Sequence, residues 1–245
     1  NIVALKAVLE DIKKHDVEAI YCLGDVIGYG PNPIESLDEA YNLCEIILLG
    51  NHEEAVLTQA LGFNFRAKEA VNWTREQLKP SWLNISKTRN RWKILQKLPL
   101  IYREDDFLFV HGSPRDPTME YILKSDTQDL FGDIPEKIRE IIEQTEKVCF
   151  VGHTHIPGII TEDSQWYDVC EFSGVWKIRQ GERIICNVGA VGQPRDKDTR
   201  ACYVTITTDE IFYHRVEYNV KEVQKRIRKI TQLHNSSADR LEIGR

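Results

Sequence analysis

The chain has 245 residues and a formal net charge of −6, which suits one α/β domain with a substantial core. This acidic balance does not favour nucleic-acid binding, which needs clustered Lys and Arg to displace counterions from phosphates. No apolar run approaches the ~20 residues of a bilayer span, and we expect no membrane contact. The six cysteines form no C-x-x-C pair, and no signal-peptide pattern opens the sequence, so we expect a cytoplasmic protein.

The first predicted element is a helix over residues 2–12, where apolar residues recur at helical spacing after Asn1, a good N-cap. Short apolar runs follow at 19–23, 46–49, 107–110, 148–151 and 184–186. Their apolarity is continuous rather than alternating, which is typical of strands that are covered on both faces. The pattern therefore predicts a central sheet that lies between other layers.

Helical patterns occupy most of the remaining chain. We expect helices within 54–97, broken at Pro80, with core anchors at Trp73, Leu78, Trp82 and Trp92. Residues 118–144 are predicted to be mostly helical, 203–207 and 211–216 to form a hairpin, and 221–229 to form an amphipathic helix. We find neither a repeat nor a linker, which favours a single domain over residues 1–245.

Each of the first four apolar runs ends close to a side chain that can bind a metal. These side chains are Asp25, Asn51 with its neighbour His52, His111, and the pair His153 and His155. Alone, each is equally compatible with a turn or a helix cap. Strand ends at one edge of a sheet converge in space, so that together they predict a shared metal site.

The ligand types narrow the choice of metal. Carboxylate, amide and imidazole groups without thiolates suit divalent Mn, Fe, Co, Ni or Zn and argue against a closed structural zinc site. A carboxylate such as Asp25 can bridge two ions, an arrangement that activates water and holds a phosphoryl group.

The ordered motifs Gly24-Asp25, Gly50-Asn51-His52-Glu53, His111-Gly112 and Gly152-His153-Thr154-His155 resemble those of the calcineurin-like metallophosphoesterase superfamily. The stretches GDVIGYGPNP, HGSPRDP and NVGAVGQPRD are similar to its compact bacterial and archaeal phosphodiesterase or protein-phosphatase-like branch. The resemblance implies a central β-sandwich of mixed sheets flanked by helices, in four αββα layers.

The resemblance also implies roles for these residues. Asp25 would bridge two divalent ions, of which Mn is favoured, and His52 would stabilise the phosphoryl oxygens or protonate the leaving oxygen. Asn51, His111 and His153 would complete one ion's ligands, and His155 would bind the other. The implied reaction is hydrolysis of a phosphomonoester or phosphodiester by metal-bound hydroxide, on a small phosphorylated substrate or a phosphoprotein.

Three departures from the family pattern matter. The family's Asp-x-His strand belongs directly before Asn1, where the given sequence starts; without it the His155 ion has two ligands fewer and the sheet one inner strand fewer. The motif at Asp25 continues into Val26-Ile27-Gly28 rather than Asp-Arg-Gly, which weakens the analogy with phosphoserine and phosphothreonine phosphatases. Residues 162–182 exceed a tight connection, and we expect either a plain hairpin or a substrate-contacting flap there.

Two alternatives stay open. A scaffold of the same fold that binds protein partners needs none of these histidines, whereas a metal-dependent nuclease is disfavoured by the acidic charge.

Tyr29, Arg115 and Arg195 are weak candidates for substrate contact, since each arginine precedes an aspartate (Asp116 and Asp196) with which it can form a local ion pair. The sequence leaves the oligomeric state open.

Overall fold

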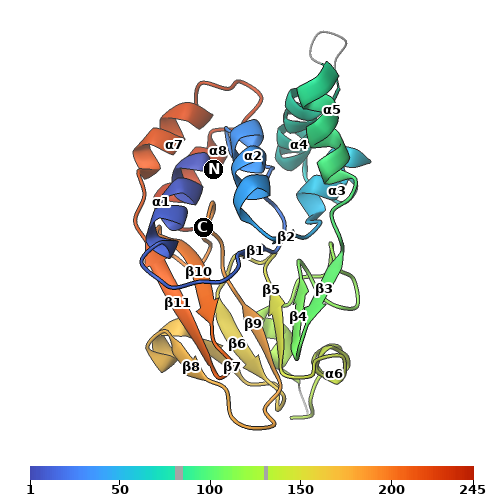
Figure 1. The fold of residues 1–245 in the computed structure, drawn as a ribbon, viewed down its shortest axis with the longest axis vertical. Coiled ribbons are helices and arrows are strands. Elements are labelled where there is room, and N and C mark those ends of the chain that lie inside the picture. The colour runs from blue at the N-terminus through green and yellow to red at the C-terminus, as the bar shows by residue number, and fades with distance from the viewer. Residues whose placement is uncertain (81–84, 130–131) are drawn as a thin grey trace.

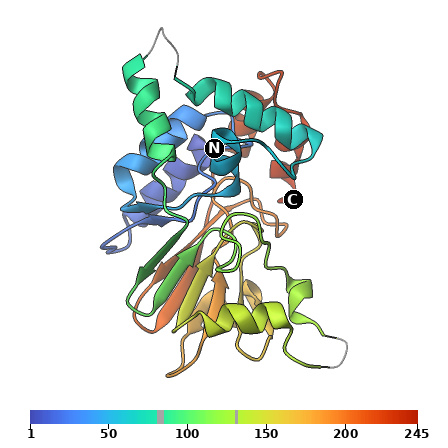
Figure 2. The same ribbon diagram turned by 90° about the vertical axis from the view of Figure 1, so that its right-hand side faces the viewer.

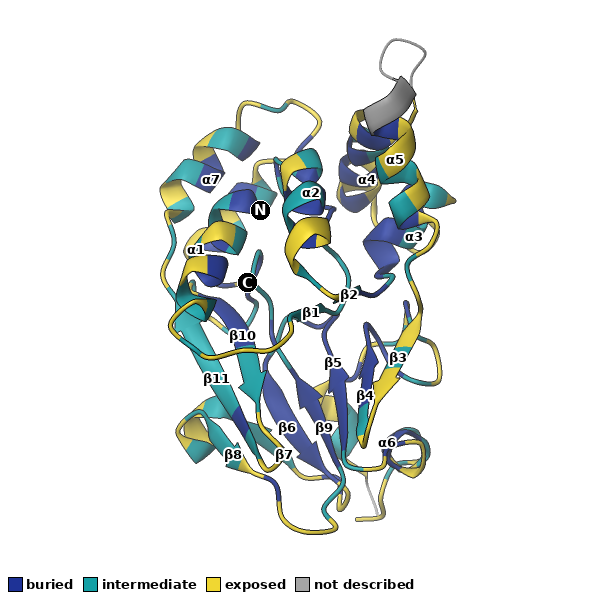
Figure 3. Ribbon diagram, in the orientation of Figure 1, coloured by how far each residue is buried: buried dark blue, intermediate teal, exposed yellow. Residues whose placement is uncertain are grey.

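The computed structural model describes residues 1–80, 85–129 and 132–245 (Figure 1). Its centre is a six-stranded mixed sheet. The strands β4, β5 and β9 run parallel to one another, and the strands on either side of them, β3 and β6, run antiparallel to them. In sheet order the strands are β3 (Ile101–Glu104), β4 (Phe107–Val110), β5 (Val148–Val151), β9 (Ile184–Asn187), β6 (Gly158–Thr161) and β7 (Trp166–Asp168). Every residue of β5, β6 and β9 is buried (Figure 3), which confirms the prediction from continuous apolarity for β5 and β9.

Five further strands face this sheet. They are β10 (Ala201–Ile206), β11 (Glu210–Val216) and β8 (Val175–Lys177) in one antiparallel sheet, and β1 (Tyr21–Cys22) and β2 (Ile46–Ile47) in a parallel pair. Side chains from all three sheets share one apolar core, in which Phe109 and Phe150 stack at 5.1 Å and Leu48 and Ile211 are fully buried. The predicted hairpin near residues 203–216 is confirmed as β10 and β11.

Helices form the outer layers. They are α1 (Ile2–Ile12), α2 (Pro33–Leu43), α3 (Asn51–Leu57), α4 (Phe65–Leu78), α5 (Ile85–Leu95), α6 (Glu136–Glu143), α7 (Val220–Ile227) and α8 (Ser236–Asp239). The α6 helix lies across the outer face of the six-stranded sheet (Figure 2), where Ile138, Ile141 and Ile142 enter its core. On the other side, Ala4 and Val8 of α1 pack on Ala201 and Tyr203 of β10. The four-layer αββα architecture is thus as predicted.

Local chemistry explains the helix boundaries. The side chain of Asn1 accepts a hydrogen bond from the N–H of Ala4 and caps α1, as expected. The α4 helix ends at Leu78 because Lys79 takes an extended conformation before Pro80. Trp82 lies outside the described residues. No helix in the described ranges is long and apolar enough to cross a bilayer.

The sequence prediction for residues 118–144 is wrong, whereas that for residues 162–182 is wrong only for the hairpin, and a substrate-contacting flap there stays a prediction. The described residues in 118–144 are mostly irregular, and their helical turns are limited to Lys124–Thr127 and α6. The segment 162–182 is no hairpin closed on itself: β7 pairs with β6, whereas β8 pairs with β11 in the other sheet. It therefore gives each of the two larger sheets an edge strand, and the pairing of β8 with β11 is a long-range contact that local patterning does not encode.

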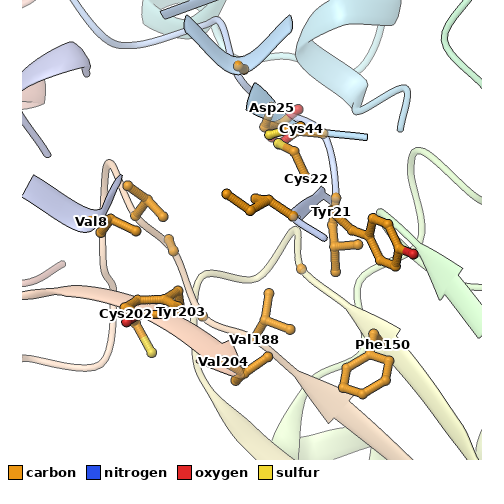
Figure 4. Close-up of a pocket in the computed structure, with 18 of the residues that line it drawn as sticks. Val8, Tyr21, Cys22, Asp25, Cys44, Phe150, Val188, Cys202, Tyr203 and Val204 are labelled. Carbon is orange, nitrogen blue, oxygen red and sulfur yellow. The ribbon is translucent and has the colours of Figure 1, made fainter. Parts of the chain in front are cut away.

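A cavity of about 1390 Å³ separates β1 from β10. Figure 4 shows its apolar lining, with Tyr21 and Cys22 on one side, Cys202 to Val204 on the other, and Val188 between them in this view. Within the described residues, β1–β2 and β10–β11–β8 share no strand-to-strand hydrogen bonds. Asp25, His52, His111, His153 and His155 also line this cavity, so the predicted site lies at its border.

Candidate metal centre

Loops at the ends of four strands carry the predicted ligands. His111 follows β4 directly, and His153 lies two residues beyond the end of β5. Asp25 lies in the loop after β1, and Asn51 opens α3 after β2. Parallel pairing of β4 with β5, and of β1 with β2, brings the carboxyl ends of each pair to one edge. The side chains converge there for this reason.

The structure brings three of the predicted ligands into one cluster. One ligand atom each from Asp25, His111 and His153 lies within 4.8 Å of the other two, and Asp25 Oδ2 is 3.4 Å from His111 Nε2. The amide end of Asn51 that faces them is 3.0 Å and 3.2 Å from the Asp25 oxygens, and 3.3 Å from both His111 Nε2 and His153 Nδ1. All four residues thus point at one small volume.

Hydrogen bonds to main-chain carbonyls fix which imidazole nitrogens face this volume. Nδ1 of His111 lies 2.7 Å from the carbonyl of Leu23, and Nε2 of His153 lies 3.3 Å from the carbonyl of Met119. A carbonyl can only accept, so these nitrogens carry the protons. The opposite nitrogens, 3.0 Å apart, then present lone pairs to each other. Two lone pairs 3.0 Å apart repel each other unless the nitrogens share a proton or bind a common metal ion.

The pKa directions favour one positive charge next to Asp25, on His111, and a neutral His153. Burial alone would raise the pKa of Asp25, but the charges of His111 and His52 outweigh it and lower that pKa. Burial would lower the pKa of His111, but the Asp25 carboxylate raises it. Burial and then the charge of His111 lower the pKa of His153 to about 4. His153 is therefore neutral near pH 7, as a metal ligand must be.

His155 stands beside this cluster rather than in it. Its Nδ1 lies 2.7 Å from the carbonyl of Gln193, so Nε2 is left with the lone pair. Burial and then the charge of Arg195 lower the pKa of His155 to about 3. It is a neutral potential ligand at a neighbouring position, as a second ion would require.

His52 is buried, at 4 % exposure, between two aromatic rings. The rings of Tyr29 and Phe63 lie 4.6 Å and 5.1 Å from it, both edge-on. Its main-chain N–H donates to Asp25 Oδ1 at 3.0 Å, whereas its Nδ1 has no hydrogen-bond partner in the described part of the chain. Burial lowers the pKa of His52, although Asp25 acts in the opposite direction. A buried imidazole with a free nitrogen beside the ligands is suited to contact a substrate.

The backbone is strained at the ligands. Asp25, His153 and His155 have φ values of 53°, 57° and 63°, in the left-handed region that side chains rarely adopt. Gly50 is required nearby, because a Cβ there would lie 2.3 Å from Asp25 Oδ1. Strain at three predicted ligands indicates that the surrounding structure holds them for a function.

Glu53 holds the two ligand loops together, a role that sequence analysis missed. Its carboxylate is fully buried and accepts the N–H groups of Asp25 at 2.8 Å, Gly50 at 3.0 Å and Ile27 at 3.1 Å. Burial and then the charge of Asp25 raise its pKa to about 7. The available signal was its position three residues after Gly50, typical of half a capping box.

Glu53→Gln is expected to lower stability by about 1–3 kcal/mol, because the amide NH2 group must then face at least one buried N–H donor. The loss appears as a lower thermal midpoint. Glu54→Gln, at the next position of α3, is the matched control, since the carboxylate of Glu54 accepts a side-chain hydrogen bond only from Thr118 Oγ1 in the described part of the chain. Equal midpoints for Glu53→Gln and wild type would contradict the assigned role.

The three weak substrate candidates differ in their surroundings. Arg115 forms ion pairs with Glu120 at 3.6 Å and Glu140 at 3.2 Å, not with Asp116. Asp196 pairs with Arg215, so the expected local pair with Arg195 is not formed either. Tyr29 contacts His52, as described above. Tyr121, which sequence analysis missed, stacks on His153 with ring centres 3.8 Å apart.

Comparisons with known proteins agree with this architecture. Residues 1–210 match the calcineurin-like phosphoesterase superfamily domain. An uncharacterized protein of Methanocaldococcus jannaschii, MJ0912, is 32 % identical over 100 % of this chain and 94 % of its own length. A metallophosphoesterase from Sphaerobacter thermophilus has a similar structure, with a TM-score of 0.80, 34 % identity, and coverage of 100 % of this chain and 95 % of its own.

The hypothetical protein PH1004 of Pyrococcus horikoshii shares the fold, with a TM-score of 0.72 at 20 % identity, over 100 % of this chain and 94 % of its own. The chain belongs to the calcineurin-like phosphoesterase superfamily. Membership of this family indicates metal-dependent hydrolysis of phosphoesters. The cluster at Asp25 offers ligands for a divalent metal.

Proposed function

We propose that the chain hydrolyses a phosphomonoester or phosphodiester with the help of two divalent ions, manganese being favoured. The observation that carries this proposal is the convergence of Asp25, His111 and His153, each with one ligand atom within 4.8 Å of the other two, with the Asn51 amide beside them. These residues would hold one ion, and Asp25 with His155 would hold the other. The ions supply positive charge that activates water and stabilises the phosphoryl oxygens.

The chain's own residues have separate tasks. The carbonyls of Leu23 and Met119 hold the imidazoles of His111 and His153 in the tautomer that binds a metal. His52 would donate a hydrogen bond to a phosphoryl oxygen or deliver a proton to the leaving oxygen, since its ring lines the cavity beside Asp25. The substrate would be a small phosphorylated molecule or a phosphoprotein.

The first test is hydrolysis of p-nitrophenyl phosphate and of bis(p-nitrophenyl) phosphate by the purified protein. We expect nitrophenolate release from at least one of them when Mn²⁺ is added, loss of this activity with EDTA, and recovery when Mn²⁺ is in excess. Elemental analysis of the active protein is expected to find two ions per chain. No release from either compound with Mn, Co, Ni and Zn would refute hydrolysis and favour the scaffold alternative.

A further inference from the structure

Two arginines from distant parts of the chain meet beside the metal centre. Arg195 lies in the loop between β9 and β10, and Arg240 begins a short 3-10 turn (Arg240–Glu242) after α8. Both donate to the same side-chain oxygen, Gln193 Oε1, from Arg195 Nη2 at 2.9 Å and Arg240 Nη1 at 3.4 Å. The main-chain carbonyl of Gln193 holds His155. One residue thus connects the arginine pair to a predicted metal ligand.

Within the described residues, neither arginine has a carboxylate partner. Their neighbours in sequence are aspartates that bind other arginines: Asp196 pairs with Arg215, and Asp239 pairs with Arg228 at 2.8 Å. The Nε atoms of Arg195 and Arg240 are both buried, and neither has a hydrogen-bond partner in the described ranges. Buried guanidinium donors without acceptors are costly. The pair therefore holds guanidinium donors that no protein acceptor in the described residues satisfies.

The positive charge extends towards the reacting centre. Burial and then the charge of Arg195 lower the pKa of Arg240, as expected for like charges held close together. The charge of Arg195 also acts on His52 and His155, and both arginines act on Tyr29, whose ring touches that of His52. In a chain of net charge −6, this is a local positive group at the border of the metal site.

We propose that Arg195 and Arg240, with Tyr29 between them and His52, form a second anion subsite that binds a phosphoryl group other than the one that reacts. Guanidinium groups bind phosphate oxygens by paired, charge-assisted hydrogen bonds, which a simple monoester would leave unused. The preferred substrates would thus carry two phosphoryl groups, as diphosphates and bisphosphates do. This inference rests on the proposed function for the position of the reacting group.

The test compares two non-hydrolysable ligands, methylphosphonate and methylenediphosphonate, by calorimetric titration of the Mn²⁺-loaded protein. We expect the diphosphonate to bind at least about tenfold more tightly than the monophosphonate. We expect Arg195→Gln or Arg240→Gln to lower this ratio of affinities by about tenfold. Arg228→Gln is the matched control: this arginine is close in sequence to Arg240 but paired with Asp239, and its substitution is expected to leave the preference unchanged.

The outcomes separate the two proposals. Equal affinities for both ligands would overturn the subsite, and so would a preference that survives in both glutamine variants, because metal chelation would then explain it. The titration needs no turnover. If the titrations gave the expected result but no hydrolysis were detected, the proposed function alone would be refuted. Arg240→Lys keeps the charge and is expected to regain part of the preference, which guards against a glutamine variant that fails to fold.

Discussion

Asp25→Asn is expected to remove bound metal and to lower the rate of metal-dependent hydrolysis by about a thousandfold or more. The rate falls because the ions stabilise charge in the transition state by several kcal/mol, and this stabilisation is lost when the ions are lost. The substitution removes the single negative charge of the cluster, which lies 3.4 Å from His111 Nε2. Asparagine retains an oxygen that can accept the N–H of His52, so the loop is expected to keep its conformation. Elemental analysis and the nitrophenolate assay measure both effects.

The matched control for this substitution is Asp209→Asn, at an exposed aspartate whose partner is Lys147 at 3.2 Å. It makes the same chemical change far from the cluster in the chain and is expected to alter neither metal content nor rate. An Asp25→Asn protein with wild-type metal content and rate would show that the cluster is not the metal centre.

His52→Ala is expected to reduce kcat by about 10²–10³ while the metal content stays at the wild-type value. The reason is that His52 lines the cavity beside Asp25 but contributes no atom to the group formed by Asp25, His111 and His153. His52→Gln, which fills more of the buried space, separates lost chemistry from lost packing. Single-turnover rates on p-nitrophenyl phosphate provide the measurement.

His234→Ala, at an exposed histidine bonded to Ser236, serves as the control for this series. If His52→Ala lost metal in proportion to activity, His52 would be a ligand or a support of the ligands instead. If it kept the full rate, the catalytic role would be wrong.

The strands that position the site could be predicted because their signal is local. Phe107–Val110 and Val148–Val151 are strands with the predicted boundaries, since continuous apolar runs are buried on both faces. Given parallel strands, convergence of Asp25, Asn51, His111 and His153 followed from the geometry of sheet edges. The order of the motifs then identified the family, which the comparisons confirm.

The groups that orient the ligands could not be predicted in the same way. His111, His153 and His155 bind main-chain carbonyls of Leu23, Met119 and Gln193, and any residue type supplies a carbonyl. Similarly, Arg195 and Arg240 are 45 positions apart in the numbering, and nothing in their local sequence indicates that Gln193 joins them. Such contacts depend on how loops fold over the sheet, which no local pattern records.

The cluster takes its side chains from two sheets that share no strand pairing in the described ranges. Asp25 and Asn51 belong to the β1–β2 pair, whereas His111 and His153 follow strands of the six-stranded sheet. A cation held by all four is consequently a cross-link, comparable to a disulfide, that fastens the short β1–β2 ribbon to the main body. Chelation should therefore expose this ribbon to proteases before the rest of the chain unfolds, and the rigidity of the ribbon would then depend on the same ion as the proposed reaction.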